Sequence, residues 1–166
     1  MKVESKGITG GKIADRFGSK GSQFTPGGMP SYSLPISIID PPSDAVSFAL
    51  VMVDYDAVPV CGFTWIHWLV ADMRRLSLDE NESVSAKDIK QGVNSFHSCA
   101  SPLSSEEAVG YGGPDPPDRE HEYVLEVFAL DKELGLENGF MLNDLVKAMD
   151  GNILAYANIK GKYPQR

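Results

Sequence analysis

Residues 54–59 read DYDAVP and place two carboxylates, Asp54 and Asp56, directly after an apolar run. Residues two apart in an extended chain point the same way, so this pair could bind a ligand or move a proton together. The alternative is that the two aspartates end a strand and begin a turn, for which Asp is well suited. On these residues alone, the turn is the favoured interpretation.

A second segment, residues 65–68, reads WIHW and puts His67 between Trp65 and Trp68. Burying an imidazole without a hydrogen-bond partner costs about 1–3 kcal/mol, so a strand histidine of this kind needs one. The partner is either a backbone carbonyl, as in an ordinary core histidine, or a bound ligand. The residues alone do not favour one over the other.

A third segment, residues 111–117, reads YGGPDPP and is followed by His121 and Tyr123. Glycine lets a ligand approach the backbone, and the flanking prolines fix the loop at low entropic cost. The loop around Gly113 therefore predicts a nest of N–H donors for an anion, with a tight structural turn as the alternative. Nucleotide binding is not supported, because neither glycine-rich phosphate motif is present.

Together these segments supply two acids, two imidazoles and aromatic walls. Such a set suits general-base catalysis or a metal site, but it specifies neither. The sequence has no G-x-S-x-G elbow and no H-E-x-x-H helix, and no serine or cysteine is marked as a nucleophile. We therefore predict a binding site rather than an enzyme, without metal or cofactor. A small hydrolase that uses the Asp/His cleft is the alternative.

The elements that must position these residues are predicted to be strands. Residues 45–53 form a short apolar run typical of a strand buried on both faces, and residues 121–130 form another strand. A last strand is expected at residues 153–159. Residues 1–44 are interpreted as loops joining short strands, and residues 74–109 show no firm element.

The strand at residues 63–73 carries the histidine between the tryptophans. Its period of two predicts Trp65, His67 and Leu69 on one face, with Ile66 and Trp68 on the other.

One helix is predicted at residues 143–149, with Asn143 as its cap and Gly151 as its stop. The strand and helix pattern lacks the alternating rhythm of a parallel sheet, so the expected fold is mainly β. With 166 residues, the chain is expected to form one domain spanning residues 1–166.

Composition limits the partners. A formal net charge of −8 repels phosphate at long range, so no nucleic-acid partner is expected and any anion must be held locally. The longest apolar run, residues 45–53, is far short of the ~20 residues of a membrane span, and no signal-peptide core is present. A cytoplasmic protein is expected. Cys61 and Cys99 are expected to be free, partly buried thiols, with a single bridge between them as the alternative.

The ordered set of segments resembles the phosphatidylethanolamine-binding protein family, also called Raf kinase inhibitor-like. Residues 54–59 are similar to its D-P-D-A-P motif, residues 65–68 to its histidine strand, and residues 111–123 to its Y-x-G-P-x-P-P…H-R-Y segment. Residues 151–155 and 161–163 resemble the C-terminal strand of the bacterial and archaeal branch.

This resemblance implies a β-sandwich-like domain with peripheral helices and a small pocket for phosphate-like or phosphoethanolamine-like anions at the strand ends. It leaves open whether the protein modulates a partner such as a kinase or a protease, and whether it forms a homodimer. The same resemblance implies that Asp56 lies behind the pocket and supports it. The residues assigned to ligand binding are Asp54, Asp56, Trp65, His67, Gly113, Pro116, His121 and Tyr123.

Overall fold

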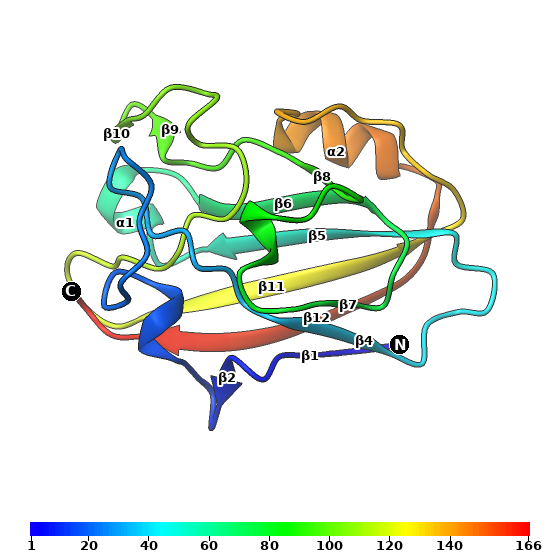
Figure 1. Cartoon of the computed structure of the whole chain (residues 1–166), viewed down its shortest axis with the longest axis horizontal. Helices are drawn as coiled ribbons and strands as arrows, with labels where there is room; N and C mark the ends of the chain where they lie inside the picture. The colour runs from blue at the N-terminus through cyan, green and yellow to red at the C-terminus, as the bar shows by residue number, and fades with distance from the viewer.

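The computed structural model describes residues 1–166, and its main feature is a mixed sheet of seven strands (Figure 1). Three long antiparallel neighbours, β12, β11 and β5, lead into β6, and short strands complete both edges. In spatial order the strands are β2 (Ile8–Thr9), β3 (Lys12–Ile13), β12 (Ile153–Tyr163), β11 (His121–Leu130), β5 (Ser47–Asp54), β6 (Trp65–Met73) and β8 (Lys90–Gln91).

Smaller elements surround this sheet. A three-stranded sheet contains β1 (Lys2–Glu4), β4 (Ile36–Ile39) and β7 (Ser77–Leu78), and β9 (His97–Ser98) pairs with β10 (Ser101–Pro102). The helices are α1 (Val58–Cys61) and α2 (Leu142–Met149), with single 3₁₀ turns η1 (Asp15–Phe17) and η2 (Glu82–Val84). In Figure 1, α1 and the β9–β10 hairpin lie at one end of the large sheet, and α2 lies toward the other.

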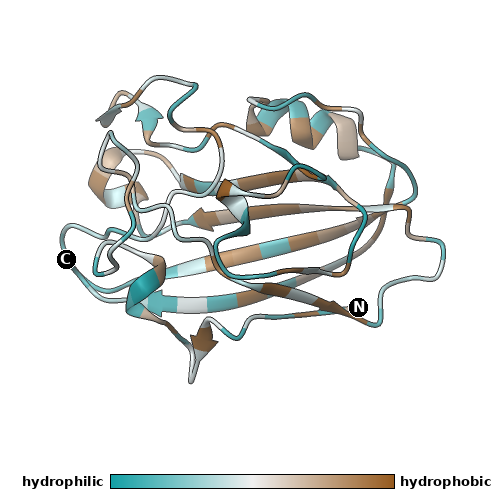
Figure 2. Cartoon of the chain, in the orientation of Figure 1, coloured by the Kyte–Doolittle hydropathy of each residue, from teal (hydrophilic) through white to brown (hydrophobic).

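The large sheet is covered on both faces, which explains why every residue of β5 is buried. Alternate side chains enter two separate clusters, as the period of a strand requires. In Figure 2, β5 and β6 are brown along most of their length. One cluster, shared with the three-stranded sheet, contains Phe48, Leu50 and Met52, whereas the other, shared with Leu145 and Met149 of α2, contains Ala49, Val51 and Val53.

A β-bulge at His67 changes the predicted faces of β6. Val53 pairs with Ile66 and Met52 pairs with Trp68, so His67 is the extra residue between two rungs. Ile66 packs on the α2 side and Trp68 on the opposite side, whereas the strict period of two placed both on one face. That face assignment is wrong because a bulge re-aims the side chains that follow it.

The mainly β prediction is confirmed, and the boundaries are close. The strand expected at residues 45–53 runs over Ser47–Asp54, and the strand at residues 121–130 is matched by β11. The segment 74–109 was expected to have no firm element but contains β7, η2, β8, β9 and β10. These elements are short, so they leave little periodicity in the sequence. No helix in the structure is both long enough and apolar enough to cross a membrane.

The predicted N-cap of helix α2, Asn143, is wrong. The helix begins at Leu142, and Met141 is its extended N-cap residue. The carboxylate of Asp144 accepts a hydrogen bond from the Met141 N–H at 3.0 Å, which closes the first turn. Asn143 is not the cap, because it lies inside the first turn and its side chain donates to Asp144.

Candidate functional site

A cavity of about 420 Å³ lies where the ends of β5, β6 and β11 meet the proline-rich loop before β11. The sheet register explains the convergence, because Asp54 at the end of β5 pairs with Tyr123 on one side and with Trp65 on the other. Six of the eight predicted site residues line this cavity: Asp54, Trp65, His67, Pro116, His121 and Tyr123.

His121 is held between two carboxylates. Its Nδ1 lies 2.7 Å from Asp54 Oδ2, and its Nε2 lies 2.8 Å from Asp118 Oδ1. Burial alone would lower the pKa of His121, but the hydrogen bonds to Asp54 and Asp118 outweigh burial and raise it. Since both ring nitrogens face acceptors, the imidazolium form satisfies both contacts. The pair is buried, with side-chain exposures of 1% for His121 and 4% for Asp54.

His67 has the opposite environment. Its Nδ1 lies 2.5 Å from the Gly112 carbonyl oxygen and donates to it, as in an ordinary core histidine. Burial is the main cause that lowers the pKa of His67 below its usual value. The neutral ring therefore keeps a lone pair on Nε2, which has no hydrogen-bond partner in the protein. Tyr123 packs edge-on against the His67 ring, with centroids 5.0 Å apart.

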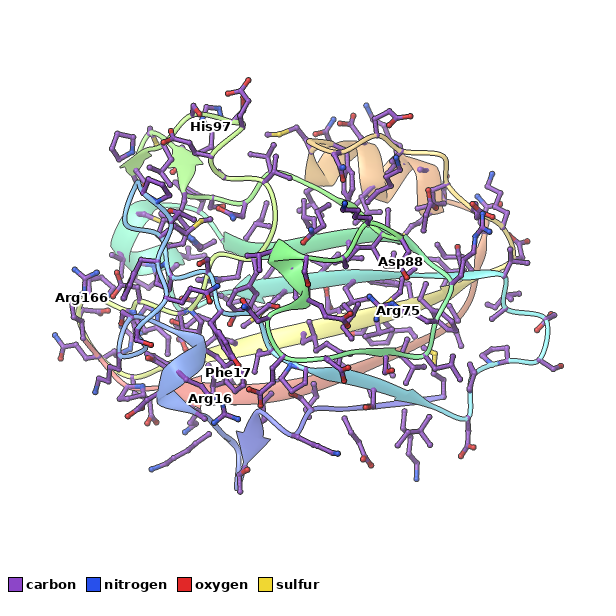
Figure 3. All side chains as sticks on the ribbon, viewed as in Figure 1. Arg16, Phe17, Arg75, Asp88, His97 and Arg166 are labelled. Atoms are coloured by element: carbon purple, nitrogen blue, oxygen red, sulfur yellow. The ribbon has the colours of Figure 1, made fainter.

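Three buried polar atoms of the cavity lining have no hydrogen-bond partner: Trp65 Nε1, Tyr123 Oη and Asp115 Oδ1. The other oxygen of Asp115 accepts from the C-terminal residue Arg166, which is labelled at the edge of the molecule in Figure 3. Leaving a buried polar group unpaired costs about 1–3 kcal/mol, so unpaired groups gathered in one cavity indicate where a polar ligand fits.

Gly113 does not line the cavity, and the predicted nest is not formed. The Gly113 N–H donates to the Pro30 carbonyl and the Gly112 N–H donates to the His67 carbonyl, each at 2.8 Å. The tight-turn alternative therefore describes this loop. A Cβ on Gly113 would meet the Phe17 carbonyl oxygen and would lie 3.1 Å from the Gly18 Cα. Glycine is needed there for backbone packing.

Asp56 also lies outside the cavity lining. Its Oδ2 accepts from the Glu122 N–H at 2.9 Å, and its Oδ1 lies 3.2 Å from Arg119 Nη2. The backbone hydrogen bond from Glu122 is the largest cause that holds the pKa of Asp56 below its usual value. These contacts tie the turn after β5 to the start of β11. They correspond to the supporting position that the family resemblance implied.

Sequence reasoning missed several residues of the site. Asp115 lies within the glycine-proline segment, and Asp118 precedes His121 by three residues, so both could have been considered. Phe96 and Cys61 also line the cavity, and neither had a recognisable signal. Both cysteines are free, with Cys61 partly buried and Cys99 exposed rather than partly buried.

Comparison with known proteins agrees with this fold. A family model described as phosphatidylethanolamine-binding protein matches residues 4–164. The chain belongs to the phosphatidylethanolamine-binding protein family. The uncharacterized protein YxkA of Bacillus subtilis is 46% identical over 140 residues, which cover 80% of this chain and 82% of that protein. A UPF0098 protein of Chlamydia trachomatis is 30% identical over 166 residues and 98% of each chain.

Solved structures of this family show the same architecture. A phosphatidylethanolamine-binding protein homologue from Chlamydia trachomatis superposes with a TM-score of 0.80 at 29% identity, covering 99% of this chain and 97% of that chain. YbcL of Escherichia coli, a member of the same family, superposes with a TM-score of 0.78 at 24% identity, covering 99% and 98%. At that identity the second likeness supports the fold alone.

Proposed function

We propose that this family member is a small binding protein whose cavity takes the phosphate group of a small phosphorylated ligand such as phosphoethanolamine. The observation that carries the proposal is the group of unpaired buried polar atoms beside the His121 imidazolium. No chemical step is part of this function, and no cofactor is needed for it. The expected location is the cytoplasm.

The polar atoms of the cavity suit a ligand that carries both a negative and a positive group. Trp65 Nε1 donates and Tyr123 Oη can donate, so both suit phosphate oxygens, while the His121 imidazolium supplies positive charge. Asp115 Oδ1 and His67 Nε2 are acceptors, and they need a donor such as an ammonium group or a phosphate hydroxyl. A zwitterion meets both requirements, whereas a bare dianion meets only the first.

A hydrolase is the second candidate, because His67 Nε2 is an unprotonated base beside the cavity. Against it, no hydroxyl or thiol hydrogen-bonds to the ring of His67 or His121. The Cys61 Sγ contacts the carbonyl oxygens of Ala57 and Phe63, so the thiol is not paired with a base. Catalysis by an activated nucleophile requires such a pairing.

Action on a protein partner, such as a kinase or a protease, belongs to the same proposal. Tyr55, Val58 and Val60 lie in and beside α1, with exposures of 54%, 43% and 45%, and Val60 also lines the cavity. Exposed apolar side chains beside a ligand site are suited to a protein contact. A homodimer could use the same side chains, and the mass in solution would distinguish the two cases.

Titration calorimetry with O-phosphorylethanolamine, and separately with sulfate, tests ligand binding. Tyr123→Phe and Trp65→Phe each remove one unpaired donor, and each should weaken phosphorylethanolamine binding by about tenfold. Tyr111→Phe is the matched control, because its hydroxyl donates to the Phe17 carbonyl at 2.8 Å outside the cavity lining. The control should bind as the wild type does.

Absence of binding for both probes, or equal losses in all three variants, would contradict the proposal. Turnover of a phosphoester that co-purifies with the protein and disappears in His67→Ala would instead favour the hydrolase.

A further inference from the structure

Asp118 stands at the outer end of the Asp54–His121 pair. Its Oδ1 lies 2.8 Å from His121 Nε2, while Asp54 holds the inner nitrogen. The His121 side chain is 1% exposed, but the Asp118 side chain is 42% exposed. The buried cation of the cavity is therefore covered on its outer side by an accessible carboxylate from the protein itself.

The turn that carries Asp118 is held by side chains alone. None of the residues 118–120 makes a backbone–backbone hydrogen bond. Asp118 Oδ2 lies 2.9 Å from Arg119 Nη1, and the same guanidinium reaches Asp56 Oδ1 at 3.2 Å. Glu120 lies 3.7 Å from Lys162. Because its backbone is unpaired, this turn can move without breaking a sheet or helix ladder.

From this geometry we infer that Asp118 is an internal competitor, which occupies on His121 the position that an anionic oxygen of the ligand takes when it binds. The inference rests on the proposed function and adds a specificity-determining residue to it. Binding is then an exchange: the ligand oxygen accepts from His121 Nε2, and the Asp118 carboxylate turns outward toward Arg119 and solvent.

Charge balance favours exchange over simple addition. With Asp54 on one nitrogen and Asp118 on the other, His121 already faces two negative charges. A third anion added beside both carboxylates would meet their combined repulsion, whereas an anion that replaces Asp118 on Nε2 faces only Asp54 at the ring.

The exchange also explains selectivity. A ligand with a single carboxylate would accept from His121 only the hydrogen bond that Asp118 already accepts. A phosphate or sulfate group has further oxygens, which can accept from Trp65 Nε1 and Tyr123 Oη. Only such a group gains contacts by displacing Asp118, so the cavity should select tetrahedral oxyanions over carboxylates.

Sulfate is the probe for a direct test, because its charge is constant near neutral pH. Calorimetry at about pH 5.5, about one unit below the ordinary histidine pKa of about 6.5, favours the protonated form of His121, and Asp54 still contacts its Nδ1 in both Asp118 variants. Asp118→Ala should bind sulfate about tenfold more tightly than the wild type, because the competing charged hydrogen bond is gone. Asp118→Asn retains an uncharged acceptor and should give an intermediate gain.

Glu120→Ala is the matched control. It removes the same charge from the same turn, but Glu120 contacts Lys162 rather than His121. Its sulfate affinity should stay within about twofold of the wild type, which measures the general electrostatic effect of losing one acid. Acetate should bind the wild type far more weakly than sulfate does.

The outcomes separate the two proposals. Sulfate binding by the wild type that is no tighter in Asp118→Ala and Asp118→Asn than in Glu120→Ala overturns the competitor role and leaves the binding function standing. No binding of sulfate or O-phosphorylethanolamine by any of the four proteins overturns the binding function, and the competitor role with it. Asp118→Asn keeps the test valid if the alanine variant does not fold.

Discussion

His67 and His121 line the same cavity from the two strands that flank β5, and both are almost completely buried, with exposures of 3% and 1%. On β6, His67 donates one hydrogen bond to a backbone carbonyl, and burial lowers its pKa. On β11, His121 contacts two carboxylates, which raise its pKa against the effect of burial.

The comparison shows that the acceptors around a buried imidazole decide its role more than burial does. A single carbonyl needs one N–H and leaves a lone pair on the other nitrogen, so the β6 side of the cavity offers an acceptor. Two carboxylates favour the doubly protonated ring, so the β11 side offers a positive charge. A cavity with both sides can orient a ligand that carries opposite charges.

The largest expected effect is that of His121→Ala, which leaves Asp54 buried without its cation. The free energy of unfolding, measured by urea denaturation at pH 7, should fall by about 3 kcal/mol. His67→Ala removes the donor to the Gly112 carbonyl and opens a cavity, and should cost about 2 kcal/mol.

His97→Ala is the control for this pair, because Figure 3 shows His97 on the β9–β10 hairpin away from the sheet. It is exposed, so its loss should change stability by no more than about 0.5 kcal/mol. Adding Asp54→Asn to His121→Ala should recover part of the loss, since it removes the unpaired charge. A double variant less stable than the single one would contradict the charge argument.

A smaller effect is the pH dependence of the stability lost in His121→Ala and in His67→Ala. The two dependences should run in opposite directions. The folded pKa of His121 is raised, so its contribution is fully present below the unfolded value of about 6.5 and is lost as pH rises through the folded pKa. The folded pKa of His67 is lowered, so its contribution is present above about 6.5 and is lost as pH falls through the folded pKa.

Urea denaturation of the wild type and each variant across pH measures these contributions as differences, so that carboxylates far from both rings cancel. The cost of His121→Ala should shrink as pH rises above about 6.5, and the cost of His67→Ala should shrink as pH falls below about 6.5. Parallel curves for the two variants would show that the two rings have the same charge state.

Much of this site could be predicted from the sequence, because its residues end strands with clear apolar patterns. Asp54 ends a fully buried strand, and Tyr123 and Leu125 of β11 enter the same core cluster, as a period of two requires. The alternation failed at His67, where the bulge inserts one residue. A bulge in a strand that is apolar on both faces leaves no break in the pattern, so the sequence carried no signal of it.

The loop contacts were less predictable, because they depend on partners far away in the chain. Gly113 suggested a nest of free N–H groups, but its N–H is taken by Pro30, which lies more than eighty residues earlier. The second acceptor on His121 is Asp118, an exposed residue of an irregular turn with no periodicity to mark it. Long-range pairing of this kind is set by the fold rather than by local residue patterns.

The smallest expected effect concerns two tyrosine hydroxyls in one core cluster, one with a hydrogen-bond partner and one without. Tyr111 and Tyr123 are both 2% exposed, but the Tyr111 hydroxyl donates to the Phe17 carbonyl at 2.8 Å, whereas the Tyr123 hydroxyl has no partner. Tyr111→Phe should therefore lower the free energy of unfolding by about 1 kcal/mol, through loss of a satisfied hydrogen bond.

Tyr123→Phe should leave the free energy of unfolding unchanged or raise it by up to about 1 kcal/mol, because it removes a buried hydroxyl that nothing satisfies. Urea denaturation of both variants without ligand measures this difference, and repeating it with O-phosphorylethanolamine adds the effect of binding. Ligand should stabilise Tyr111→Phe as much as the wild type, and Tyr123→Phe less, since at a fixed ligand concentration a weaker-binding ligand stabilises the folded state less. Ligand-free Tyr123→Phe could instead lose as much stability as Tyr111→Phe does. That result would mean that the Tyr123 hydroxyl already has a hydrogen-bond partner within the protein and is not available to a ligand.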